Sequence, residues 1–161
     1  MNRYAHSTFC DDIRHEVGGK LTLVGIYAGD LLVPTFPCVL PKLCLVLNIL
    51  TSRSQPFQRL KIRILKDEET LAEGELPMQD LTASVSDAIP EDGESDETKR
   101  LLGMTAHFVF SPLKLDGPGV IRVFVETEDE EMRAPGLRIA QMQAISLADL
   151  GGLGEASEQP E

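Results

Sequence analysis

Apolar and polar residues alternate along most of this chain, in short stretches that end at glycine or proline. A period of two is typical of β-strands, in which successive side chains point to opposite faces. The clearest case surrounds Gly18 and Gly19, where apolar residues at 9, 13 and 17 precede the glycines and the run Leu21–Tyr27 follows them. Because two glycines favour a tight turn between paired strands, the pattern predicts a hairpin.

The next stretch carries three prolines, at positions 34, 37 and 41. Proline fixes φ and lacks a backbone donor, so residues 34–41 are expected to form an extended crossing loop outside any sheet interior. We expect Phe36, Val39 or both to close the edge of the core from this loop.

Two longer runs predict strands that line the core. Residues 42–51 are apolar almost throughout, which favours a central strand covered on both faces. Residues 100–110 alternate, and one face of this strand is expected to carry four apolar side chains, those of Met104, Ala106, Phe108 and Phe110.

Two further hairpins are predicted from paired alternating runs. Residues 59–64 are expected to pair with 71–76, and residues 120–126 with 132–140. Pro135 lies in the last of these strands and, because it cannot donate to a ladder, suggests that this strand is at an edge.

Seven or eight short strands without long intervening helices predict an all-β fold, a single antiparallel β-sandwich with an immunoglobulin-like or C2-like layout. A closed barrel stays an alternative. We expect one domain over residues 1–145, including an acidic flexible loop at 86–99 that has few apolar groups to offset its ordering entropy. Residues 146–161 form a polar tail that is expected to be disordered.

The charge of the chain narrows the choice of partners. With 15 basic and 26 acidic residues, the formal net charge is −11, which repels phosphate backbones and anionic lipid heads. No apolar run approaches the roughly 18 residues that span a bilayer. We therefore expect neither a nucleic-acid nor a membrane partner, and a cytoplasmic location.

The cysteines and histidines do not form a recognisable catalytic pattern. The three cysteines lack zinc-type spacing and are expected to be buried thiols, with Cys44 inside an apolar run. The three histidines fall in separate predicted elements, and no catalytic or phosphate-binding motif accompanies them. Cys10 and His15 would point to opposite faces of a regular strand, so we predict no enzyme activity and no cofactor, and an enzyme of unknown type is the least favoured alternative.

Acidic side chains at turns are weak candidates for a calcium site. Calcium needs several converging oxygen ligands, and the acids crowd three places along the chain. They are mostly consecutive, without the alternating spacing of calcium loops, so solvated hairpin tips are the preferred interpretation. A calcium-binding C2-like domain is the alternative, and its ligands would come from Asp11, Asp12, Asp67, Glu68, Glu128 and Asp129.

The segment Cys10-Asp-Asp-Ile13, followed by Gly19-Lys-Leu-Thr-Leu-Val-Gly-Ile-Tyr27, resembles the opening of an uncharacterised bacterial family of small β-sandwich proteins. That opening reads C-D-x-[IV] and then G-K-x-[ST]-L-[IV]-G-[IV]-[FY], before a proline-rich crossing. The resemblance implies a compact bacterial β-sandwich and carries no assigned activity.

Together these features predict a non-enzymatic binding or structural module of a bacterial or phage system. Such a module presents loops or an edge strand to a protein partner, or to a second copy of itself. The candidate contact residues are Phe36, Pro37 and Val39 in the proline-rich crossing, with the edge near 132–140 as a second surface.

Overall fold

The computed structural model describes residues 3–52, 55–76 and 101–142, and all its regular elements there are β-strands. The predicted acidic loop at 86–99 and the tail at 146–161 lie outside the described residues. No described segment forms a helix that could cross a membrane. The strands are β1 (Tyr4–His15), β2 (Leu21–Ile26), β3 (Asp30–Val33), β4 (Cys38–Leu40), β5 (Leu43–Ser52), β6 (Leu60–Lys66), β7 (Glu69–Leu76), β8 (Leu101–Phe110), β9 (Leu113–Leu115), β10 (Gly119–Thr127) and β11 (Glu131–Gln141).

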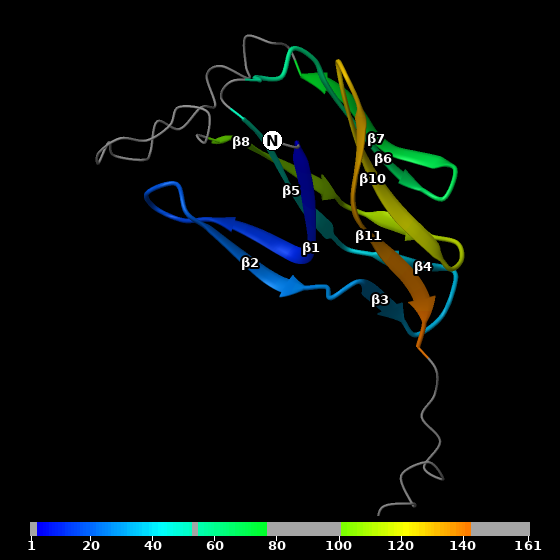
Figure 1. Cartoon of the computed structure of the whole chain (residues 1–161). Helices are drawn as coiled ribbons and strands as arrows, with labels where there is room; N and C mark the ends of the chain where they lie inside the picture. The colour runs from blue at the N-terminus through cyan, green and yellow to red at the C-terminus, as the bar shows by residue number, and fades with distance from the viewer. Residues whose placement is uncertain (1–2, 53–54, 77–100, 143–161) are drawn as a thin grey trace, which may run out of the picture.

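The strands form two main sheets that enclose one apolar core (Figure 1). A four-stranded sheet has the order β2-β1-β5-β8 and a five-stranded sheet has the order β3-β11-β10-β6-β7, while β4 and β9 make a small separate pair. All neighbours are antiparallel except β3 and β11. The prediction of an all-β sandwich is confirmed.

β5 is the central strand of the four-stranded sheet and is covered on both faces, as predicted. Leu45 and Leu47 point into the core and are completely buried. Val46 points the other way, towards what would be the solvent face, yet only 4% of it is exposed. Something must therefore cover the outer face of this sheet.

The cover is the β1–β2 hairpin. The first part of β1, from Tyr4 to Cys10, pairs with β5, and the part from Cys10 to His15 pairs with β2. The turn falls at Gly18 and Gly19, whose φ angles of 83° and 75° are favourable only for glycine. The predicted hairpin is confirmed, and Figure 1 shows β1 bending partway along its length, so that its second half and β2 run sideways from the first half.

The other two hairpins, β6–β7 and β10–β11, are also confirmed. The expected inner face of β8 is correct as well, because its four apolar side chains pack partly buried against the core.

The expectation that the strand carrying Pro135 lies at an edge is wrong. β11 lies between β10 and β3, because β3 runs parallel to its last residues, Arg138–Gln141. Pro135 precedes that parallel pairing, so its missing N–H costs the β3–β11 ladder nothing.

The proline-rich crossing packs against the core through Phe36, which is partly buried. Val39 does not contribute, since it is 56% exposed. It belongs to the short strand β4, where it is paired with Lys114 of β9.

Candidate binding surface

β2 is an edge strand with an unusual composition. Its six residues, Leu-Thr-Leu-Val-Gly-Ile, carry no charge. β1 pairs with one side of it, and no other described strand pairs with the free side. Ile26 is 59% exposed, and Leu21 and Val24 are also exposed. Exposed apolar strands with free backbone groups can accept another strand, so β2 offers the chemistry of a strand-docking edge.

The hairpin that presents this edge is firmly built. The backbone N–H of Tyr27 donates to the carbonyl of Phe9 at 2.9 Å, and the Tyr27 hydroxyl donates to the carboxylate of Asp11. Burial raises the pKa of Tyr27, and the bond to Asp11 raises it further. Gly25 has a φ of 66°, and a Cβ added there would lie 2.1 Å from Oδ2 of Asp11. This close approach requires glycine at the next-to-last residue of β2.

The hairpin rests on the outer face of its own sheet. The ring of His15 lies edge-on to the ring of His107 on β8, with centroids 5.4 Å apart. Burial lowers the pKa of His107, and the neighbouring His15 lowers it further. The Cys44 thiol donates to the carbonyl of Asp11 at 3.7 Å. These contacts explain why Val46 is buried and why β2 is held in a fixed position.

The sequence-predicted contact residues lie elsewhere, in the crossing between β3 and β5. Phe36 is half-buried, so its ring is largely used by the core. Pro37 and Val39 are exposed. The structure therefore leaves Pro37 and Val39, but little of Phe36, available to a partner.

The first pair of metal candidates, Asp11 and Asp12, is occupied by internal contacts. Asp12 accepts from the ammonium of Lys42 at 2.7 Å and lies 3.5 Å from the guanidinium of Arg14. The hydrogen bond from Lys42 is the main cause of a lowered pKa at Asp12. Asp11 is held by Tyr27.

The second pair, Asp67 and Glu68, forms the β6–β7 turn. Asp67 has a φ of 52°, and its carboxylate accepts the backbone N–H of Val120 at 3.0 Å. This bond is the main cause of its lowered pKa, and Lys66 contributes. Glu68 is exposed. Asp67 thus ties the turn to the start of β10.

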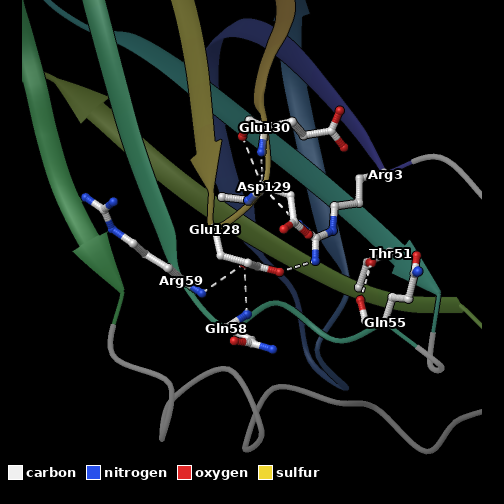
Figure 2. Close-up of polar contacts among 9 residues, drawn as sticks. Arg3, Thr51, Gln55, Gln58, Arg59, Glu128, Asp129 and Glu130 are labelled. Atoms are coloured by element: carbon white, nitrogen blue, oxygen red, sulfur yellow. Dashed lines mark hydrogen bonds and ion pairs between the residues drawn. The ribbon is translucent and has the colours of Figure 1, made fainter.

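The third pair, Glu128 and Asp129, lies in the β10–β11 turn and forms a polar cluster with the start of the chain (Figure 2). Arg3 forms an ion pair with Glu128 and lies 3.4 Å from the carboxylate of Asp129. The second oxygen of Glu128 accepts the backbone N–H groups of Gln58 and Arg59 at 3.0 and 3.1 Å.

The pKa of Glu128 reflects these contacts. Loss of solvent raises the pKa of this carboxyl, but bonds from its own backbone N–H, from Arg3 and from Gln58 and Arg59 outweigh that effect and lower it to about 2. The guanidinium of Arg3 also lies 5.0 Å from the ring centre of Phe57. Glu128 therefore fastens three separate segments together.

Within the described ranges, no three histidine, cysteine, aspartate or glutamate side chains are placed to hold a metal ion. The acidic candidates lie at three separate places, where most of them accept bonds from arginine, lysine or backbone groups. Sequence reasoning missed β2 as a surface and missed the contact between His15 and His107. β2 carries no Asp, Glu, Lys or Arg, but β5 and β8 share this feature, so composition alone did not identify β2 as a surface.

Comparison with known proteins identifies a family but no individual relative. No curated protein and no solved structure matches this chain significantly. The model of DUF6941, described as a family of unknown function, matches residues 5–140, which include all of the strands except the ends of β1 and β11. The chain belongs to the DUF6941 family.

Proposed function

We propose that this protein is a non-enzymatic binding module that presents the free edge of β2 to a protein partner, which adds an extended strand to the four-stranded sheet. The supporting observation is the uncharged, exposed edge of β2 on a hairpin fixed to its own sheet. In such recognition, main-chain hydrogen bonds provide affinity and alternate side chains provide specificity.

The edges of the five-stranded sheet suit this role less well. β7 carries Glu69, Glu73 and Glu75 among its eight residues, and charged edge strands discourage pairing with another chain. β3 has only four residues. β8, the other edge of the four-stranded sheet, also lacks Asp, Glu, Lys and Arg, but Val109 is the one large apolar side chain exposed among its described residues. β2 exposes three such side chains, those of Leu21, Val24 and Ile26.

The setting is also part of the proposal. The opening motif resembles bacterial proteins, which supports a bacterial or phage system. All three cysteines are free thiols, which is consistent with a reducing compartment such as the cytoplasm.

Site-specific photocrosslinking tests the proposal in a bacterial lysate. A photoreactive residue replaces Thr22 on β2 in one sample and Thr70 on β7 in the control. We expect one protein to be crosslinked from position 22 only, and to be lost when Val24→Lys and Ile26→Lys are combined. Unchanged circular dichroism would show that this double variant is folded. Equal crosslinking from both strands, or retention of the partner by the double variant, would contradict the proposal.

Two arms of the experiment separate the alternatives. A crosslink between two copies of this chain, with a doubled mass in light scattering, would identify the partner as a second copy. Val39→Lys tests the proline-rich crossing, and we expect it to retain the partner. Loss with Val39→Lys alone would transfer the binding role to that crossing.

A further inference from the structure

Cys10 and Cys44 face each other across two neighbouring strands. They are direct partners in the antiparallel pairing of β1 with β5, so their side chains leave the sheet on the same face. This is the outer face, beneath the β1–β2 hairpin, and the two residues are 0% and 1% exposed. Both are free thiols, and the third cysteine, Cys38, lies on β4.

The spacing of such partners suits a disulfide. Directly opposed residues in antiparallel strands have Cα atoms about 4.5–5.5 Å apart, within the range of about 4.4–6.8 Å found in disulfides. Their Cβ atoms, about 4.5–5.5 Å apart, need to approach by roughly an ångström to reach the disulfide mean of about 3.8 Å. The bond could therefore form without breaking the β1–β5 ladder.

The hairpin backbone seals this pair from solvent. The Cys10 thiol donates to the carbonyl of Asp12 at 3.5 Å, and the Cys44 thiol donates to the carbonyl of Asp11 at 3.7 Å. Burial raises the pKa of both thiols, and at Cys10 the nearby Cys44 raises the pKa further. Because the thiolate is the reacting species, both groups are slow to react while the hairpin is closed.

We propose that Cys10 and Cys44 form a reversible dithiol–disulfide site, oxidised by small-molecule disulfides when the β1–β2 hairpin lifts from its sheet. One deprotonated thiol attacks the small disulfide, forms a mixed disulfide and releases one thiolate. The second protein thiol, once deprotonated, attacks the protein sulfur of that mixed disulfide and releases the other thiolate. The protein loses two protons and two electrons, and the small disulfide takes them up to become two thiols. This inference does not depend on the binding role proposed above.

The test treats the folded full-length chain with oxidised glutathione and follows its mass. We expect a loss of 2 Da and a disulfide-linked pair of peptides containing Cys10 and Cys44. Cys38→Ser should give the same product, whereas Cys10→Ser and Cys44→Ser should form no internal bond. Because a disulfide restricts the unfolded chain, the oxidised form should melt about 5–10 °C higher.

A matched pair of glycine variants tests the role of the hairpin. Gly25→Ala strains the contact with Asp11 and should accelerate oxidation by about threefold to tenfold, because the hairpin opens more often. Gly74→Ala meets no atom within 4 Å and should leave the rate unchanged. If Gly25→Ala does not fold, His15→Ala replaces it by removing the ring contact with His107.

Two results would overturn the proposal. One is that the native chain keeps both thiols free under glutathione conditions that oxidise them after unfolding in urea. The other is an internal disulfide that includes Cys38. An equal rate in wild type and in the folded hairpin variant would refute gating by the hairpin.

Discussion

The two hairpins at the margins of the main sheets, β1–β2 and β6–β7, expose their edge strands in opposite ways. β1–β2 lies over its own sheet, buries Val46, and ends in an edge strand without charge. β6–β7 ends the five-stranded sheet, and its outer face carries ion pairs such as that between Lys61 and Glu73. One hairpin lies against the outer face of its sheet and leaves an uncharged edge strand exposed, whereas the other carries charged side chains on its edge strand.

This difference indicates where the molecule is protected from other strands. Charge on an edge strand discourages pairing with another chain, so β7 is protected from such pairing. β2 lacks that protection although exposed apolar edges promote aggregation, so its composition needs another explanation. The proposed docking role is one.

The largest effect is expected beneath the β1–β2 hairpin. Val46→Asp places a carboxylate on a surface that the hairpin excludes from water, and burying an unpaired polar group is costly. We expect a loss of about 3 kcal/mol in the free energy of unfolding, measured by urea denaturation.

Phe124→Asp is the control for Val46→Asp. Phe124 points outward from the five-stranded sheet, where Arg63 and Arg133 flank its ring at 5.4 and 5.9 Å. A carboxylate there stays hydrated and meets two cations, so the loss should be about 1 kcal/mol or less. Similar losses at both positions would show that the hairpin does not cover its sheet.

The next effect concerns the charged anchor of β6–β7. Glu128 holds the backbone N–H groups just before β6, and its pKa falls from 4.5 to about 2 in the folded protein. A lowered folded pKa means that the stabilisation is complete above pH 4.5 and is lost as the pH falls towards 2.

Glu128→Gln should therefore destabilise the protein by about 1–2 kcal/mol at pH 7, because hydrogen bonds to a charged group are strong. The difference from wild type should shrink between pH 4.5 and pH 2, as followed by urea denaturation at each pH. A difference that does not vary with pH would contradict the ionic role of Glu128.

Local patterns in the sequence account for the hairpins but not for how they meet. Gly18-Gly19 marks a turn, and the apolar run of β5 requires cover on both faces. The turn and the burial of β5 can therefore be predicted from neighbouring residues. The pairing of β3 with β11 is not, because Asp30 and Arg138, which form a two-bonded ion pair at 2.6 and 3.0 Å, are 108 residues apart.

The candidate functional residues also depend on contacts between distant parts of the chain, which local sequence does not reveal. Consecutive acids predicted a possible cation site, but the sequence does not reveal that Arg3 reaches Glu128 across 125 positions. Likewise, Cys10 and Cys44 are unremarkable in spacing until β1 pairs with β5. Contacts set by strand register need the fold itself.

A smaller effect separates the glycines of the two edge strands. Gly25→Ala in β2 combines a positive φ with the close approach to Asp11, and we expect a loss of about 1–2 kcal/mol. Gly74→Ala in β7 meets open space at an ordinary φ, so it should change the free energy of unfolding by less than about 0.5 kcal/mol in either direction. Equal losses would mean that β2 is no more tightly constrained than β7.

The smallest effect is expected on the outer face of β6–β7. The hydrogen bond from Lys61 is the main cause of the lowered pKa of Glu73, but the Glu73 side chain is 44% exposed, so water and salt screen the pair. Glu73→Gln should leave the urea midpoint unchanged within error at physiological salt. Its consequence should appear instead in solubility, because removing charge from β7 weakens the protection of that edge. If the double variant Glu73→Gln and Glu75→Gln does not self-associate at high concentration, charge does not protect the β7 edge from pairing. The difference between β7 and β2 would then rest on the exposure of apolar side chains alone.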